Sequence, residues 1–259
     1  MRISAAFALL QDLRLAVQAA FVPTVLAIFK SPLLLIYPRE VSRIFMSHVW
    51  KAFGNGVDEN GRPVKQDLIK SNAYGVVLDI GAGHGHTLLY LDPTKVTKYV
   101  ALEPNALMHS EIRTLAATKG FSEAAGNLAL LPYGAEDIWL VISALGGSNT
   151  VDSMIAILTI CSIPEPERTL EALVRDVLKP GGTFVFYEHV LSHRDDVAWW
   201  QRFWTPIWKT AFDGCRLDRP TDVWVQKMDT WKEASVWNKE GEEEEHLFWH
   251  RVGRFVKKD

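Results

Sequence analysis

A glycine-rich segment, Gly81-Ala82-Gly83-His84-Gly85, most constrains what this chain of 259 residues can fold into. It directly follows Val76–Ile80, a short apolar run typical of a buried strand, and we expect a helix to continue from it to Leu91. A glycine-rich turn between a strand and a helix lets the backbone approach a nucleotide cofactor closely. The segment therefore predicts the first strand and the ligand-binding turn of an open α/β sheet.

Strand-like and helix-like stretches alternate beyond this turn, which indicates a mostly parallel sheet with helices on both faces. Lys179-Pro180-Gly181-Gly182 should end one of the helices, and the acidic run Glu242–Glu245 should form a solvated hairpin loop. We therefore predict an α/β, Rossmann-like fold with a seven-stranded sheet. The further strands are expected at Tyr99–Leu102, Leu128–Leu131, Val151–Leu158, Thr183–Val190, Trp231–Trp237 and His246–Val256. The helices are expected at Leu107–Ala117, around Trp139, at Glu167–Leu178 and over residues 195–212.

Residues 1–38 are the most apolar part of the chain and raise the question of a membrane. Their longest uncharged run, Leu15–Phe29, has 15 residues, whereas a spanning helix needs about 20. Asp12 and Arg14 break the apolar region too early for a signal peptide. Such a helix can lie in a membrane interface, cap a pocket of its own protein or pack on the core, and the sequence leaves all three open. A helical projection places Gln11, Arg14 and Gln18 on one face and Leu9, Leu10, Leu13, Val17 and Phe21 on the other.

A second helical pattern, Val41–Val49, is expected to end in a loop at Gly54–Gly61. We therefore divide the chain into an apolar helical N-terminal segment, residues 1–60, and a catalytic domain, residues 61–259.

Charge and cysteine content exclude several classes of protein. A net charge of −3 argues against a nucleic-acid partner, which requires a basic face. Cys161 and Cys215 are too few for a disulfide framework, so we expect reduced thiols inside the cell, in the cytoplasm or on the cytoplasmic face of an internal membrane. No His, Cys and Asp residues stand at the spacing of metal ligands, so the spacing predicts no metal site.

A carboxylate, Glu103, follows the second expected strand 18 positions after Gly85. A carboxylate there can accept hydrogen bonds from both hydroxyls of a cofactor ribose. The dinucleotide fingerprint requires a third glycine where His86 stands, so NAD is disfavoured.

Four motifs in this order make the chain resemble class I S-adenosylmethionine-dependent methyltransferases over residues 70–190. Two further segments, Phe186–Val190 and Phe212–Cys215, and the aromatic helix resemble the membrane-associated methyltransferase-like thiol methyltransferases. That group also carries an apolar N-terminal segment. Small fungal polyketide O-methyltransferases are similar in size and outline. The four motifs are Val77–Gly85, Leu102–Asn105, Gly134–Asp137 and Leu178–Gly182.

The resemblance implies S-adenosylmethionine as the cofactor and a role for each matching residue. Asp79, Gly81, Ala82, Gly83 and Gly85 would hold its methionine part and ribose. Glu103 would take the ribose hydroxyls, Pro104 next to it would contact the cofactor, and Asn105, Ala135 and Glu136 would lie at the adenine. Thr159 to Ser162 would line the passage to the acceptor.

Two residues are candidates for a catalytic base. His189 stands at the carboxyl end of the fifth strand, where ligands of open α/β sheets gather, and Asp213 is the second candidate. A strand-end histidine bonded to its neighbours and a structural aspartate are the alternative interpretations. Cys215 is a packing thiol or a contact of the acceptor.

Ten tryptophans are an unusual number, and seven of them lie between Trp199 and Trp237. Trp200, Trp204 and Trp208 repeat every four residues and form one stripe on the expected helix, which either packs in the core or lines the acceptor site. An aromatic wall favours a flat, lipophilic acceptor with few charges.

These observations favour methyl transfer to an enolic or phenolic hydroxyl of a small lipophilic metabolite, such as a polyketide or pyrone of secondary metabolism. Thiol S-methylation is the nearest alternative. The others are a methyltransferase fold reused as a cyclase or pericyclase, and a non-catalytic protein that binds a membrane surface through residues 1–38. Ile160-Cys161-Ser162-Ile163 lacks the motif that methylases of adenine or glutamine nitrogens carry after the fourth strand.

Overall fold

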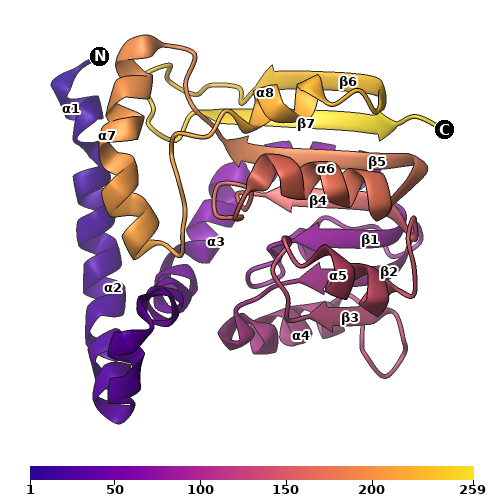
Figure 1. Ribbon diagram of the computed structural model, residues 1–259, viewed down its shortest axis with the longest axis horizontal. Coiled ribbons are helices and arrows are strands. Elements are labelled where there is room, and N and C mark those ends of the chain that lie inside the picture. The colour runs from indigo at the N-terminus through magenta and orange to yellow at the C-terminus, as the bar shows by residue number, and fades with distance from the viewer.

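A seven-stranded sheet forms the centre of the protein, whose computed structural model describes residues 1–259 (Figure 1). The strand order is β3-β2-β1-β4-β5-β7-β6, and the sheet is parallel apart from β7, which runs antiparallel to both β5 and β6. This confirms the predicted Rossmann-like sheet. The strands are β1 Gly75–Ile80, β2 Val96–Leu102, β3 Leu128–Leu131, β4 Val151–Ile157, β5 Leu178–His189, β6 Trp231–Asn238 and β7 His250–Lys257.

Helices cover both faces of the sheet, because neighbouring strand residues point to opposite sides. Leu78 packs with α5 (Ile138–Leu145), α6 (Pro166–Asp176) and α8 (Thr221–Lys227) on one face. Its neighbour Val77 packs on the other face with α4 (His109–Thr118) and the end of α3 (Pro38–Asn72). The remaining elements are α1 Ile3–Ala6, α2 Ala8–Lys30, α7 Asp195–Ala211 and the short 3₁₀ helices η1 Pro32–Ile36, η2 His86–Leu89 and η3 Ala106–Met108.

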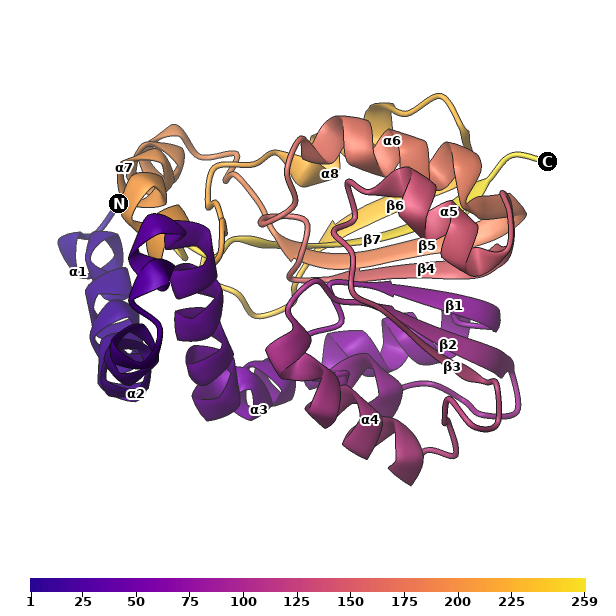
Figure 2. The same cartoon turned by 60° about the horizontal axis from the view of Figure 1, so that its bottom comes forward.

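A third layer lies across the carboxyl ends of the parallel strands. Helices α1, α2 and α7 and the first half of α3 gather there, beside the sheet rather than on its faces (Figures 1 and 2). Leu9 of α2, Val49 of α3 and Trp208 of α7 share one buried cluster in this layer. The third layer places the N-terminal segment next to the edge of the sheet where ligands bind in open α/β folds.

The structure corrects three boundaries. The loop predicted at Gly54–Gly61 is helical, because α3 runs unbroken through it, and the division at residue 60 falls inside this helix. Glycine at position 61 is required by packing, since a Cβ there would lie 3.0 Å from the Tyr187 ring. The helix expected to reach Leu91 is only the short η2. The helix α6 ends at Asp176, so Lys179–Gly182, which we expected to end it, lies inside β5.

Candidate active site

The glycine-rich loop between β1 and η2 has the backbone shape that the sequence predicted. Gly81 and Gly83 have φ angles of +63° and +56°, in the left-handed region that favours glycine. A Cβ at Gly81 would overlap the Thr159 hydroxyl, and one at Gly83 would lie 2.9 Å from Trp50 Nε1. The loop therefore requires glycine both for its conformation and for the close approach of its neighbours.

Two carboxylates flank this loop. The Glu103 side chain accepts hydrogen bonds from the backbone N–H groups of Gly83 and Asn105, both at 2.8 Å. Burial raises the pKa of Glu103 to about 7. Asp79 accepts a hydrogen bond of 2.5 Å from the Tyr99 hydroxyl, and burial raises the pKa of Asp79 to about 6.

Two adjoining cavities contain nearly all the predicted cofactor residues. Trp50 and Gly81 line both cavities, whose volumes are about 140 and 40 Å³. Each is smaller than the roughly 300–1,000 Å³ typical of small-molecule sites. Gly85 lies apart and caps η2. The larger cavity is lined by Gly81, Gly83, Glu103, Pro104, Asn105, Ala135, Glu136 and Thr159, and the smaller one by Asp79, Gly81 and Ala82.

Sequence reasoning missed the contribution of α3 to this site. Its residues Arg39, Arg43, Met46 and Trp50 line the larger cavity. The Trp50 indole N–H is buried without a hydrogen-bond partner, so it is free to donate to a ligand. The apolar periodicity of residues 41–49 predicted the helix, but no local signal could place it over a loop more than thirty residues away.

A separate cavity of about 470 Å³ adjoins the cofactor cavity. The two share the side chains of Met46, Trp50, Leu158, Ser162 and Phe212 as common walls. Its other walls are mostly apolar and come from α2, α3, α7 and the segment before β7. This is the arrangement expected of an acceptor site, because a reacting atom in one cavity can meet a group held in the other.

The chain at the junction of these cavities is strained. Leu158 has a φ of +54°, an uncommon conformation for a bulky residue, and it lines all three cavities. The buried Glu188 carboxylate holds the next turn by accepting hydrogen bonds from the N–H groups of Thr159 (2.7 Å) and Ile160 (3.0 Å). Burial raises the pKa of Glu188 to about 8. Glu188 is therefore a positioning residue for the passage predicted at Thr159 to Ser162.

The three tryptophans of the stripe lie in two different environments. Trp208 lines the acceptor cavity. Trp204 does not, because its indole N–H donates to the Ala6 carbonyl at 2.8 Å, and Trp200 packs on Phe7 with ring centroids 5.2 Å apart. Of the two alternatives left open for the stripe, Trp200 and Trp204 thus take the packing one, because they anchor the N-terminal helices and do not line the acceptor cavity.

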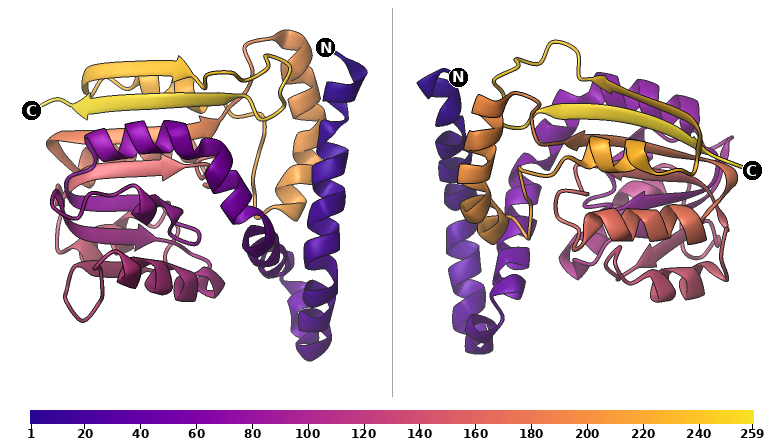
Figure 3. Two further views of the ribbon diagram at one scale, coloured as in Figure 1. Left: turned by 180° about the vertical axis from the view of Figure 1, so that it is seen from behind. Right: turned by 45° about the horizontal axis from the view of Figure 1, so that its top comes forward.

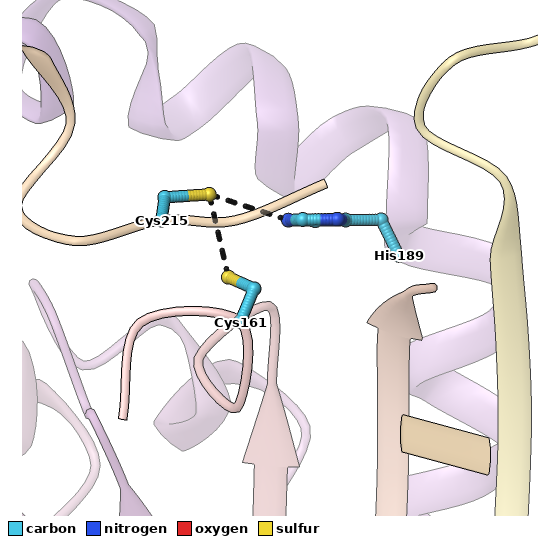
Figure 4. A group of neighbouring side chains, drawn as sticks. All are labelled: Cys161, His189 and Cys215. Atoms are coloured by element: carbon cyan, nitrogen blue, oxygen red, sulfur yellow. Dashed lines mark hydrogen bonds between the residues drawn. The ribbon is translucent and has the colours of Figure 1, made fainter. Parts of the chain in front are cut away.

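The two candidate bases lie in different cavities. Asp213 lines the cofactor cavity, 3.7 Å from the Arg43 guanidinium, and is absent from the acceptor cavity. His189 lines the acceptor cavity and is buried. The Cys215 sulfur lies 3.4 Å from both His189 Nε2 and the Cys161 sulfur (Figure 4). The structure thus brings His189 and Cys215 together, and it adds Cys161, which the sequence placed in the passage at Thr159 to Ser162 without a role of its own.

Folding also assembles groups that spacing along the chain did not reveal. The ligand atoms of Cys161, His189 and Cys215 lie within 4.8 Å of one another, although these residues are far apart in the sequence. Glu242 is buried rather than solvated, and it accepts hydrogen bonds from the His250 backbone N–H (2.7 Å) and ring (2.5 Å). Hydrogen bonds from His246 and His250 hold the pKa of Glu242 well below its usual range.

Comparisons with known proteins agree with this geometry. A family model described as a methyltransferase domain matches residues 57–225. The chain is 29% identical over 166 residues to thiol S-methyltransferase TMT1B of Rattus norvegicus, an alignment that spans 62% of each chain. More than a third of that relative therefore remains unmatched.

Solved structures share the fold at low sequence identity. A SAM-dependent methyltransferase from Thermotoga maritima, described as a possible histamine N-methyltransferase, has a TM-score of 0.54 and 18% identity, covering 82% of this chain and 100% of that one. The [4+2]-cyclase SpnF has a TM-score of 0.53 and 15% identity, covering 74% of this chain and 80% of that one. The same fold thus occurs in a methyltransferase and in a cyclase.

Proposed function

This chain belongs to the methyltransferase domain family, and we propose that it transfers a methyl group from S-adenosylmethionine to the sulfur of a small, lipophilic thiol. The apolar cavity beside the cofactor cavity carries the proposal. It is large enough for a small organic molecule, and Asp213 is absent from its walls. Its polar lining includes the two thiols of Cys161 and Cys215, three imidazoles and the carboxylate of Asp12 near the N-terminus. The similarity to a rat thiol S-methyltransferase supports the same choice of acceptor.

The residues of the cofactor cavity fit S-adenosylmethionine. Glu103 would present its carboxylate to the ribose hydroxyls, and Gly81 and Gly83 line the same cavity without side chains of their own. Asp79 lines the smaller cavity beside the glycine loop, where it would hold the methionine part, and Asn105, Ala135 and Glu136 line the larger one, where they would lie at the adenine. When bound, the cofactor supplies a methyl group already activated on a sulfonium sulfur.

The chain's own contribution to the reaction is orientation and exclusion of water. Leu158 and Ser162 lie between the two cavities, where the acceptor must meet the methyl group. Trp50 and Phe212 contribute aromatic rings to the walls that the two cavities share, and His189 with the two cysteines lines the acceptor cavity. Such a site needs little acid–base chemistry when the acceptor reacts as its anion.

A membrane surface is part of the proposal, because the hairpin formed by α2, η1 and the start of α3 projects beyond the rest of the molecule (Figure 3). The stretch Ile3–Lys30 is long and apolar enough to cross a membrane, and 17% of its most apolar window is buried. Its exposed apolar side chains share the outer half of α2 with Gln11, Arg14 and Gln18 rather than lying on a separate face as the helical projection predicted. The opposite half, which includes Leu9, Ala16 and Ala20, is buried. The exposed apolar residues of the hairpin tip are Phe21, Val22, Leu26, Phe29, Leu33, Leu35, Ile36 and Tyr37.

This hairpin also links the membrane to the acceptor. Leu15 and Ala16 of α2 line the acceptor cavity, while the same helix continues into the exposed tip. A tip inserted into a lipid surface would bring the cavity to where lipophilic thiols concentrate. The expectations of a pocket cap and of a membrane interface are thus compatible within one helix.

Incubating the full chain with methyl-labelled S-adenosylmethionine tests the acceptor. The panel contains a lipophilic thiol, the phenol of the same skeleton and a pyrone. We expect label on the thiol and little on the hydroxyl compounds. Labelling of the phenol or pyrone instead would favour the hydroxyl acceptor that the sequence placed first. A rearranged product with no label transfer would overturn methyl transfer and favour a cyclase.

A further inference from the structure

Three side chains from separate parts of the fold converge on one point of the acceptor cavity. Cys161 follows β4, His189 ends β5 and Cys215 follows α7, and all three point toward one another (Figure 4). The Cys215 sulfur lies 3.4 Å from the Cys161 sulfur and 3.4 Å from His189 Nε2. All three residues are buried, and both cysteines are free thiols.

The spacing of these atoms suits a tetrahedral zinc ion. Zinc binds thiolates at about 2.3 Å, so two sulfur ligands at tetrahedral corners lie about 3.8 Å apart. The observed separation of 3.4 Å requires only a small outward movement of the two side chains. Two thiolates also cancel the charge of Zn²⁺, so the occupied site is neutral and can remain buried in apolar surroundings.

We propose that Cys161, His189 and Cys215 bind a zinc ion whose fourth position takes the sulfur of the acceptor thiol. Three protein ligands with one open position is the arrangement of catalytic zinc sites. Because all three side chains line the acceptor cavity, the open position faces the acceptor. The zinc site stands on its own, whereas the role of its fourth position rests on the proposed thiol methylation.

Zinc binding by the protein and methyl transfer to the bound thiol are separate steps. Zinc binding releases the protons of both cysteine thiols to solvent, while neutral His189 donates a lone pair from Nε2. The acceptor thiol then loses its proton to solvent as its sulfur takes the fourth position. A bond forms between that sulfur and the methyl carbon, and the bond from the methyl carbon to the sulfonium breaks with its electron pair going to the departing sulfur. The resulting thioether is neutral and binds zinc weakly, so it leaves.

A second group, Glu242, His246 and His250, also has its ligand atoms within 4.8 Å of one another. It is the weaker candidate, because the Glu242 carboxylate is already engaged by both histidines and by a backbone N–H. In the first group, His189 Nε2 contacts only the Cys215 thiol, and no charged side chain is hydrogen-bonded to either cysteine. The first group therefore has unused ligand capacity.

Metal analysis of the full chain, purified with reductant and without chelator, tests the site independently of activity. We expect about one zinc ion per chain in the unaltered protein, and occupancy reduced by at least about tenfold in Cys161→Ser, Cys215→Ser and His189→Ala. His246→Gln and the surface variant His193→Gln should keep the metal. Cobalt added to the zinc-free protein should give a thiolate charge-transfer band and the strong visible bands of tetrahedral Co²⁺, a readout that requires no variant to fold.

Three results would overturn the site: no stoichiometric zinc or cobalt binding by the reduced chain, loss of zinc in His246→Gln but not in the cysteine variants, or a Cys161–Cys215 disulfide in the protein as it exists in the cell. Labelling assays then separate the two proposals. If the zinc-loaded chain binds S-adenosylmethionine but labels no thiol, the zinc site stands and the proposed function is overturned. If the zinc-free chain labels thiols, and Cys161→Ser labels them at the same rate, the zinc site is overturned and thiol methylation stands.

Discussion

The cofactor cavity and the acceptor cavity are adjacent, yet they are built in opposite ways. The cofactor side is assembled largely from successive loops that follow β1, β2 and β3, so most of its residues lie in short consecutive motifs. The acceptor side draws on Leu15, Val49, Cys161, Trp208 and Phe248, which are scattered through the whole chain. Local sequence therefore specifies the first cavity, and long-range packing specifies the second.

The largest expected effect tests the local side. Glu103→Ala removes the acceptor of the ribose hydroxyl hydrogen bonds, and losing charged hydrogen bonds should weaken S-adenosylmethionine binding by roughly a hundredfold. Isothermal titration calorimetry measures the change. Glu111→Ala, an exposed carboxylate on α4, is the matched control and should bind normally. A dissociation constant within about twofold of the unaltered value in Glu103→Ala would remove Glu103 from the site.

The next effect tests the projecting hairpin. Replacing the exposed Phe29 and Leu33 together by Asp should reduce the fraction of protein bound to vesicles by roughly thirtyfold, because each apolar side chain contributes on the order of 1–2 kcal/mol when buried in lipid. Flotation with anionic phospholipid vesicles measures binding. Trp139→Asp alters a residue that is 83% exposed on α5, away from the hairpin, and should bind like the unaltered chain. Equal flotation of all three proteins would remove the membrane from the proposal.

The third prediction concerns the pH dependence of S-adenosylmethionine binding, which should change the affinity roughly tenfold. Burial raises the pKa of Glu103 to about 7, and only its ionised form accepts both ribose hydroxyls. As the pH falls from 8 to 6, the ionised fraction falls, so S-adenosylmethionine affinity should fall by about tenfold, with proton release on binding near pH 7. Glu103→Gln should bind more weakly and lose most of this dependence. If the affinity of Glu103→Gln depended equally steeply on pH, a group other than Glu103 would cause the effect, and Asp79 would be the first to test.

The smallest effect separates the two halves of the tryptophan stripe. Trp208→Leu should raise the KM for the acceptor about fivefold with little change in cofactor affinity, because it reshapes only the wall of the acceptor cavity. Trp200→Leu should leave that KM unchanged and lower the melting temperature by loosening the contact with Phe7. Steady-state kinetics and thermal unfolding of the same samples decide. Equal KM changes in both variants would show that the stripe acts as one unit.

Much of the cofactor side could be predicted because backbone conformation limits the residue types there. A strand followed by glycines in the left-handed region, and by a carboxylate at the end of the next strand, describes a ligand-binding edge without any tertiary information. Gly81, Gly83 and Glu103 accordingly lie where the motifs place them. The α3 helix was the exception, because its residues over the loop resemble those of any packed helix.

For the acceptor cavity, the sequence could predict only that aromatic residues form part of its wall, not which of them do. Four-residue spacing correctly aligned Trp200, Trp204 and Trp208 on one face of α7. It could not show that α1 and α2 cover the first part of this face and leave Trp208 to the cavity. That outcome depends on where a helix nearly two hundred residues earlier in the chain docks.

The sequence by itself determined the parallel sheet, the glycine loop and the cofactor carboxylate, because periodicity, φ restrictions and strand-end positions are properties of short segments. Only the tertiary structure decided that Cys161, His189 and Cys215 meet, that Asp213 lies on the cofactor side and that Glu242 is buried. These are contacts between distant segments, and they are selected by the packing of whole helices and strands rather than by any local preference of the chain.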